Sequence, residues 1–251
     1  MTAIMQDGDS LMHPHIQIPR NDHTRCPICG WNEFSDKEIL WQELIDSWEL
    51  NEDEVRQVNT QQGKCCQQCG ANLRSMTLAG ALNEYLGWKG TLTTLVLEGN
   101  TDNVRLLEIN EAGDLTKHLS QFRHYTFVCY PQFDMQKMDI PDNTYDIVIH
   151  SDTLEHVPDP IQGLTECLRI VRPGGYMMMT IPIVPTRLTR RRANLPPSYH
   201  GSPLVREPDL LVHTEYGADF YRDMINAGWR KTTVFTLGGL EALALIGAKL
   251  P

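Results

Sequence analysis

Short hydrophobic runs, each ended by small or polar residues, recur through the second half of the chain. Residues 103–109, 145–149 and 176–184 have the uninterrupted, β-branched character of strands buried in a parallel sheet. A helical pattern over 160–171 separates the last two runs, and Arg-Pro-Gly-Gly at 172–175 closes it. Strand, helix and strand at this spacing predict one βαβ unit.

Polar loops follow two of these runs. The run at 103–109 opens into residues 110–114, and the run at 145–149 opens into 150–157. Ligands of open α/β sheets bind outside the carboxyl ends of the strands, so we expect both loops to line one crevice. Four more segments fit strands or helices. They are a strand at 125–130, a helix at 215–229 stopped by Gly228, a strand at 231–236, and an undecided helix or edge strand at 240–246.

Four segments in order resemble the class I S-adenosylmethionine-dependent methyltransferases. They lie at 106–113, 138–148, 153–157 and 169–175. The resemblance implies an α/β fold, with a Rossmann-like, doubly wound, mostly parallel sheet, over residues 76–251. It also implies that S-adenosyl-L-methionine is the cofactor.

The resemblance assigns the cofactor's amino-acid end to the turn after the first strand. Glu108 is the expected acid, and Asn110, Ala112 and Gly113 stand in the glycine-rich turn. Only Gly113 is a glycine, but asparagine tolerates positive φ better than most residues, so Asn110 is a plausible substitute.

The adenosine contacts are less regular. No acid ends the strand at 125–130, so either Asp134 loops back to the ribose or Tyr130 packs on the ribose or adenine. Asp139 maps onto the adenine-reading acid, with Ile140 and Met138 beside the ring; alternatively Asp139 only starts the next turn.

Further site residues are expected beyond these. His150 and Ser151, at the end of the next strand, are also expected at the cofactor, His150 mainly through its backbone. His156 is the first candidate for a general base, because imidazole titrates near neutral pH. The alternative is a structural role in which Glu155 and His156 bond to backbone. His200, with His213, is the second candidate.

Residues 185–215 are rich in proline and are expected to form a lid or substrate loop. Four arginines cluster in this loop: Arg187, Arg190, Arg191 and Arg192. They suit a carboxylate or phosphate on the acceptor, or else they form a solvated basic stretch.

Two Cys-x-x-Cys-Gly segments lie in the N-terminal part. Cys26 and Cys29, with Cys66 and Cys69, supply the four thiolates of a structural zinc site. Cys65 could compete with Cys66, and reduced or redox-active cysteines without metal are the alternative. A filled shell of four thiolates leaves no position for water, so the predicted zinc is structural.

Residues 25–75 are thus expected to form a small zinc-ribbon-like module with a helical insertion. One predicted helix starts at Ser35 and runs through Trp48; a second is capped by Asn51 with Glu54 and stops at Gly63. We expect Trp31, Trp41 and Trp48 to pack in the core or against the neighbouring domain rather than to form a ligand-stacking surface.

The segment Cys-Gly-Ala-Asn-Leu-Arg-Ser at 69–75 leads into a further helix. It more loosely resembles bacterial methyltransferases that carry a cysteine-rich module ahead of the catalytic domain, several of them in glycan or natural-product pathways.

Composition and net charge limit the classes of partner and the location that the sequence predicts. A net charge of −10 argues against nucleic acid. No apolar run approaches the roughly 18 residues of a membrane span, and residues 1–24, expected to be mobile, do not form a signal peptide. The sequence thus predicts a cytoplasmic protein of open oligomeric state.

Two hypotheses of function follow. One is methylation of a small, oxygen-bearing and perhaps anionic acceptor, with N-, C- and S-methylation left open. The other is a non-catalytic binding or assembly module with a degenerate cofactor site.

Overall fold

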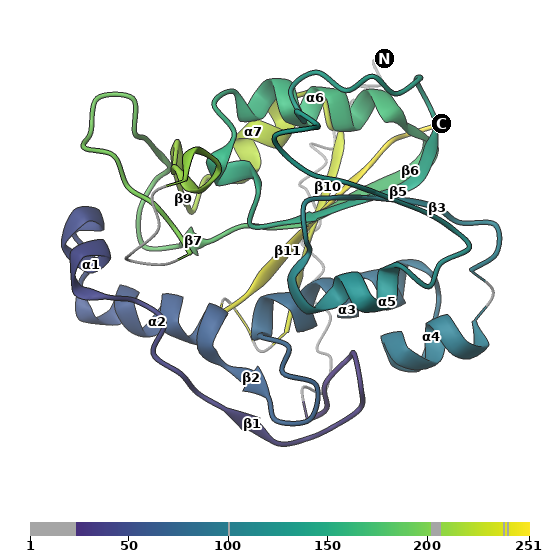
Figure 1. Ribbon diagram of the computed structural model, residues 1–251, viewed down its shortest axis with the longest axis horizontal. Coiled ribbons are helices and arrows are strands. Elements are labelled where there is room, and N and C mark those ends of the chain that lie inside the picture. Colours follow the sequence, from purple (N-terminus) through teal and green to yellow (C-terminus); the bar gives the residue numbers. More distant parts are fainter. Residues whose placement is uncertain (1–23, 100, 202–206, 238, 240) are drawn as a thin grey trace, which may run out of the picture.

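A six-stranded sheet with the order β10-β11-β6-β5-β3-β4 runs through the centre of the protein (Figure 1). The structure is a computed structural model that describes residues 24–99, 101–201, 207–237, 239 and 241–251. The strands are β3 (Arg105–Ile109), β4 (His124–Val128), β5 (Tyr145–Ser151), β6 (Val171–Thr180), β10 (Lys231–Thr236) and β11 (Leu243–Ala248). Neighbours among β3 to β6 are parallel, whereas β11 is antiparallel to both β6 and β10. The predicted mostly parallel sheet is confirmed.

Helices cover both faces of this sheet (Figure 1). On one face lie α3 (Leu73–Tyr85), α4 (Leu92–Glu98) and α5 (Thr116–Leu119); on the other lie α6 (Pro160–Ile170) and α7 (Tyr221–Asn226). Side chains alternate between the two cores, since Ile147 and Ile149 join the α3 side and Val148 joins the α6 side. The sheet is therefore doubly wound, as predicted.

The predicted βαβ unit is β5-α6-β6. Helix α6 starts as its sequence indicates, with Asp159 accepting a hydrogen bond from the Gln162 amide and Pro160 in the first turn. Residues 172–175 are not a separate turn, however. They lie inside β6, where the register with β5 jumps from Tyr145↔Val171 to Ile147↔Tyr176.

Two C-terminal elements differ from the sequence pattern. The expected helix at 215–229 is wrong in its first half, because β9 (Thr214–Gly217) pairs with both β7 (Ile183–Val184) and β8 (Arg190–Arg191). Only α7 is helical there. The undecided segment at 240–246 contributes strand β11, whose backbone pairs on both sides.

The N-terminal module starts with a short antiparallel pair, β1 (Phe34–Ser35) and β2 (Cys65–Cys66). A helix beginning at Ser35 is wrong, because Ser35 pairs with Cys65, and α1 spans Gln42–Trp48. Helix α2 (Glu52–Gly63) has the predicted Asn51–Glu54 capping box and ends at the predicted glycine.

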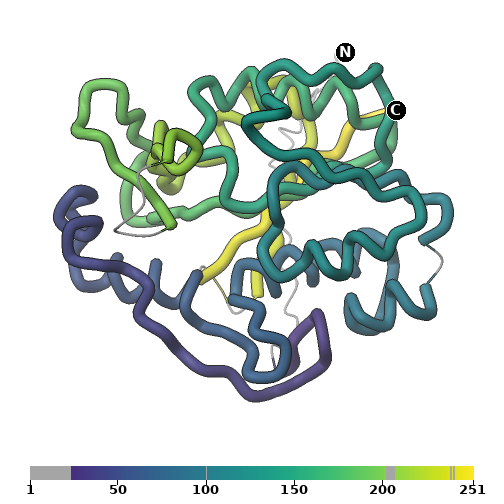
Figure 2. The backbone as a smooth tube through the Cα atoms, in the orientation of Figure 1, coloured from purple at the N-terminus to yellow at the C-terminus, as the bar shows by residue number. Residues whose placement is uncertain are grey.

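The two helices of the module dock onto the segment that carries β7 and β8 (Figure 2). Leu44, Trp48 and Val58 share an apolar cluster with Val184 and Val212. The packing interpretation is confirmed for Trp48, whose indole nitrogen donates to Ser198 Oγ at 2.9 Å. Trp31, in contrast, is 42% exposed.

Within the described ranges, none of the helices is long and apolar enough to cross a bilayer. The histidines at positions 13, 15 and 23, and the segment 202–206 of the proline-rich loop, lie outside those ranges.

Candidate active site

The turn after β3 is organised by Glu108, whose carboxylate is fully buried. Its Oε1 accepts hydrogen bonds from the Ala112 amide (2.7 Å) and from Thr116 Oγ1 (2.6 Å). Its Oε2 accepts one from the Tyr125 hydroxyl at 2.6 Å. Glu108 therefore fixes the shape of the turn through hydrogen bonds to its buried carboxylate.

Two residues of this turn occupy the left-handed region. Asn110 has φ 57° and Gly113 has φ 58°, so asparagine does take the place of a glycine there. A Cβ at Gly113 would lie 3.0 Å from Ser75 Oγ on α3, which leaves no room for a larger side chain.

Asn110 also joins the ends of three strands. Its Oδ1 accepts from the Tyr130 amide after β4 (3.0 Å), and its Nδ2 donates to Thr153 Oγ1 after β5 (3.3 Å). The loops that follow β3, β4 and β5 therefore meet at one edge of the sheet, where the crevice was expected.

The loop after β4 separates the two candidates for the ribose. Asp134 is exposed, and its Oδ1 accepts from the Gln136 amide at 2.8 Å, so this carboxylate closes a local turn. Tyr130 is bound to Asn110 through its amide, and 48% of its surface is exposed beside the turn. Tyr130 is thus the better placed of the two.

Residues 138–140 are held by an ion pair that the sequence analysis did not identify. Glu166 accepts from the Met138 amide (2.8 Å), and Arg169 donates to the carbonyl oxygens of Met138 (2.8 Å) and Ile140 (2.6 Å). Asp139 is exposed between these anchors, and Ile140 is half-buried. The i,i+3 spacing of Glu166 and Arg169 on α6 was the available signal.

The side chains of His150 and Ser151, at the end of β5, are enclosed. Burial lowers the pKa of His150 to about 4, so its imidazole is neutral at physiological pH. Ser151 Oγ lies 2.6 Å from Thr180 Oγ1 on β6. Only the backbone of these two residues is left to face a ligand.

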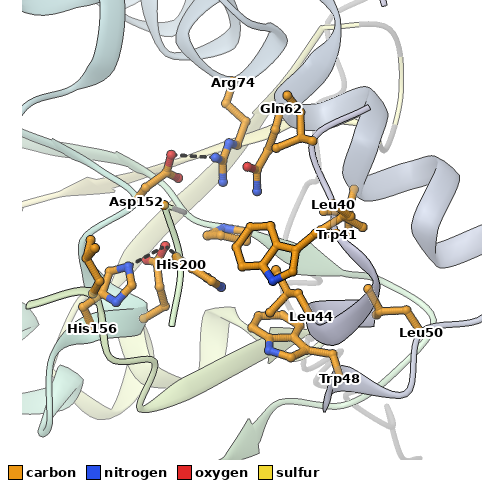
Figure 3. Close-up of a pocket in the computed structure, with 16 residues that line it drawn as sticks. Leu40, Trp41, Leu44, Trp48, Leu50, Gln62, Arg74, Asp152, His156 and His200 are labelled. Atoms are coloured by element: carbon orange, nitrogen blue, oxygen red, sulfur yellow. Dashed lines mark ion pairs between the residues drawn. The ribbon is translucent and has the colours of Figure 1, made fainter. Parts of the chain in front are cut away.

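Beyond β5 lies a cavity of about 260 Å³ between the module and the sheet (Figure 3). The module supplies an apolar wall, and the end of β5 with its neighbours supplies a polar one. The apolar wall contains Leu40, Trp41, Leu44, Trp48, Leu50 and Val58; the polar wall contains Arg74, Asp152, Glu155, His156 and His200. Trp48 packs against His200, with ring centroids 5.2 Å apart, and His200 packs against His156 at 5.1 Å.

Arg74 is the cation of the polar wall. Its side chain is 5% exposed and lies 2.6 Å from Asp152 Oδ2, while its Nε and Nη1 atoms have no hydrogen-bond partner among the described residues. Asp152 follows β5 at φ 49°. The guanidinium therefore offers unused donors to a ligand in the cavity.

Glu155, His156 and His200 form the second polar group of this wall. Glu155 Oε1 lies 3.7 Å from His156 Nε2 and 3.8 Å from His200 Nδ1. His156 Nδ1 lies 3.0 Å from the carbonyl oxygen of Leu211. A carbonyl only accepts, so Nδ1 carries the proton and neutral His156 has its lone pair on Nε2. The two predicted catalytic histidines are thus brought together.

The arginines of the proline-rich loop face carboxylates of the protein itself. Arg187 pairs with Glu54, Arg191 with Asp223 at 2.8 Å, and both Arg190 and Arg192 with Glu215. The charges of these four arginines are compensated internally, so within the described residues of the loop they form neither a free anion site nor a solvated basic stretch. Arg74 is the guanidinium at the cavity.

The four cysteines named as metal ligands lie together, with all sulfurs within 4.8 Å of one another. Cys26 Sγ is 3.7 Å from Cys69 Sγ, and Cys29 Sγ is 3.6 Å from Cys66 Sγ. Cys66, and not Cys65, belongs to the cluster.

The two knuckles have the same backbone. Gly30 (φ 83°) donates to the Cys26 carbonyl oxygen, and Gly70 (φ 80°) donates to that of Cys66. Both positions need glycine, because only glycine adopts this φ readily.

Residues 87–179 match the family described as methyltransferase domain. This match is a likeness of part of the chain to a methyltransferase domain. The matched range includes the turn after β3, both loops of the crevice and the β5-α6-β6 unit as far as residue 179.

Curated relatives of this domain match over shorter stretches. A ubiquinone biosynthesis O-methyltransferase of Pseudomonas aeruginosa is 30% identical over 105 residues, 41% of this chain and 45% of the relative. A probable S-adenosylmethionine-dependent methyltransferase of Mycolicibacterium smegmatis is 33% identical over 58 residues, 21% of this chain and 23% of the relative. The chain spans less than half the length of these relatives.

Among solved structures, a putative methyltransferase in complex with the Trm112 activator of Haloferax volcanii is similar over 70% of this chain and 80% of its own. Its sequence identity is 11% and its TM-score is 0.37.

Proposed function

We propose that this protein is an S-adenosylmethionine-dependent methyltransferase that acts on a small molecule. The supporting observation is that the segment matching the methyltransferase domain forms one continuous crevice edge, at which the loops after β3, β4 and β5 are joined by Asn110.

In this proposal the methyl donor lies across that edge. The turn at 110–113 receives its amino-acid end, and Gly113 lets this turn lie close against Ser75 of α3. Tyr130 packs beside the ribose, and Asp139 with Ile140 meets the adenine. Arg74 binds the donor's carboxylate, because its free guanidinium donors lie at the α3 end of the crevice and suit a carboxylate.

The acceptor then occupies the cavity beyond β5. A volume of about 260 Å³ suits a small molecule, and the wall of Trp41 and Trp48 suits an apolar or ring-shaped one. For a hydroxyl acceptor, the oxygen attacks the methyl carbon, the carbon–sulfur bond breaks with its electron pair going to sulfur, and the acceptor proton passes to a base. His156 Nε2 is the base and His200 lies beside it; a carboxylate acceptor would need neither.

A structural zinc belongs to the same proposal. Tetrahedral zinc with Zn–S bonds of about 2.3 Å places its sulfurs about 3.8 Å apart. The Cys26–Cys69 and Cys29–Cys66 sulfur–sulfur distances, 3.7 and 3.6 Å, fit that value. All four positions are thiolates, so this metal would hold the module together and take no part in chemistry.

One observation favours the alternative of a non-catalytic module. The loop after β4 offers no carboxylate to the ribose, since Asp134 closes its own turn. Isothermal titration with S-adenosylhomocysteine, the demethylated donor, decides between the two. The proposal requires a dissociation constant on the order of micromolar, within the usual range for enzyme ligands.

The two variants are Gly113→Val and, as a control, Asp209→Asn at an exposed position of the proline-rich loop. The first should abolish the binding heat because valine resists positive φ and would collide with Ser75. The second should bind as the wild type does. Wild-type protein that releases no heat at millimolar ligand would remove the proposal.

A further inference from the structure

Glu155, His156 and His200 have the composition of a metal site that is separate from the four cysteines. One carboxylate oxygen and two imidazole nitrogens lie within 4.8 Å of one another on the polar wall of the cavity. Two imidazoles and one carboxylate are a recurrent ligand set for catalytic zinc and for other divalent transition metals.

Glu155 has two imidazoles at ion-pair distance but lacks the hydrogen bonds that a buried carboxylate normally has. Its side chain is 1% exposed, and neither of its oxygens forms a hydrogen bond within the described part of the chain. A buried carboxylate without hydrogen bonds is strongly unfavourable, so such a group indicates a missing cation or ligand. The charge of Arg74 is already shared with Asp152, and both histidines lie beyond hydrogen-bond distance of Glu155.

His156 is oriented as a metal ligand would be. Its Nδ1–H donates to the Leu211 carbonyl oxygen at 3.0 Å, which directs the lone pair of Nε2 toward Glu155 and His200. Metal-bound histidines usually donate their second nitrogen to a backbone carbonyl or a carboxylate in this manner. His200 is held in turn through its amide, which donates to Leu210 O at 3.0 Å.

The spacing of the three ligand atoms suits a site that tightens on binding. Ligands at about 2.0–2.1 Å from tetrahedral zinc lie about 3.3 Å apart, and the measured separations from Glu155 Oε1 are 3.7 and 3.8 Å. The two separations from Glu155 would need to shorten by a few tenths of an ångström, and the two imidazole nitrogens already lie within 4.8 Å of each other. A fourth position then faces the cavity that the same residues line (Figure 3).

We propose that Glu155, His156 and His200 bind a divalent transition-metal cation, with an open coordination position directed into the cavity. The metal site does not depend on the proposed function. The use of its open position does: there it would take an oxygen of the methyl acceptor, and His156 would be a ligand instead of a base.

The test is a cobalt titration of the full-length, zinc-loaded protein, followed by absorption and calorimetry, without methyl donor. Cobalt bound by imidazole and carboxylate gives ligand-field bands without the intense sulfur-to-cobalt charge-transfer bands of a thiolate site. The expected result is uptake of about one cobalt per chain with ligand-field bands alone.

Three variants and one control assign the site. His156→Ala, His200→Ala and Glu155→Gln should each weaken cobalt binding by more than the roughly 10–100-fold that loss of a supporting contact costs. His124→Ala, which removes an exposed imidazole at the start of β4, should bind cobalt as the wild type does. Thermal unfolding of each variant shows that it is folded; if His156→Ala is not, the other two decide.

Absence of cobalt uptake, bands from thiolate alone, or unchanged uptake in the folded variants would overturn the proposal. The two proposals can fail separately, because S-adenosylhomocysteine is titrated into the same samples. Donor binding without cobalt uptake removes only the metal site, and cobalt uptake without donor binding removes only the methyltransferase assignment.

Discussion

Glu54 connects the N-terminal module to the domain that carries the cavity, and its removal should loosen both. Its side chain is 3% exposed. Oε1 accepts from Arg187 Nε at 2.7 Å, and Oε2 accepts from the Asn51 amide at 3.0 Å and also pairs with Arg187 Nη2. Arg187 in turn donates to the Trp48 carbonyl oxygen at 2.6 Å. The change Glu54→Gln leaves the shape and removes the charge.

The magnitude follows from the pKa of this carboxyl group. Hydrogen bonds from Arg187 hold the pKa of Glu54 at about 2, against an ordinary value of 4.5. That difference corresponds to about 3 kcal/mol. It agrees with the roughly 3–5 kcal/mol lost when one partner of a buried ion pair is removed. We expect Glu54→Gln to lower the free energy of unfolding by about 3 kcal/mol at pH 7.

The same pKa shift of Glu54 determines how the stability it contributes depends on pH. Because the pKa of Glu54 is lower in the folded protein, its contribution is complete above about pH 4.5. It is lost as the pH falls toward about 2. The difference in free energy of unfolding between the wild-type protein and Glu54→Gln should therefore disappear as the pH falls from about 4.5 to about 2.

Urea unfolding in the presence of zinc, followed by tryptophan fluorescence, measures both effects. Glu52→Gln is the control, because Glu52 lies exposed in the same first turn of α2, and it should stay within about 0.5 kcal/mol of the wild type. A Glu54→Gln protein as stable as this control at pH 7 would refute the assignment of Glu54 to a stabilising ion pair.

Three further predictions concern the donor and the zinc. Asn110→Gly should keep S-adenosylhomocysteine affinity within about tenfold, since glycine adopts φ 57° freely and only hydrogen bonds worth about 1 kcal/mol are lost. If calorimetry showed a complete loss of binding, the Asn110 side-chain amide itself would be indispensable. Arg74→Met should weaken binding by about 10–100-fold, the usual cost of a charged hydrogen bond, whereas Arg105→Met should not; equal affinities would exclude Arg74. Cys69→Ser should reduce zinc from about one equivalent per chain and lower the melting temperature; retained zinc by elemental analysis would contradict the four-thiolate site.

The parallel sheet was predictable because its strands are buried on both faces and follow one another through short, recognisable turns. The end of helix α2 was predictable for a similar local reason, since Asn51, Glu54 and Gly63 act within their own helix. The cysteine cluster followed from spacing alone, because two residues between cysteines let both sulfurs reach one centre.

The remaining features depend on contacts distant in sequence. Ser35 looks like a helix cap until Cys65 pairs with it, and residues 214–217 look helical until β7 and β8 flank them. The arginines at 187–192 look free because their partners lie well away in the sequence: Glu54 on α2 for Arg187, and Glu215 and Asp223 for the others.

The cavity could not be predicted from the sequence for the same reason. Its two walls come from the module and from the end of β5, and His200 reaches Glu155 only because the segment before η3 (Pro208–Leu210) pairs Tyr199 with Leu211. The sequence named both histidines but gave no sign that Glu155 would lie between them, or that Arg74 would line the same space.

A crystal structure with S-adenosylhomocysteine tests the central claim most directly. We expect the amino-acid end of the ligand at the turn that holds Asn110 and Gly113, its carboxylate on Arg74, and its adenosine between Tyr130 and Asp139. The sulfur should face the cavity that His156 lines. A ligand bound elsewhere, or one whose sulfur points away from this cavity, would contradict the account.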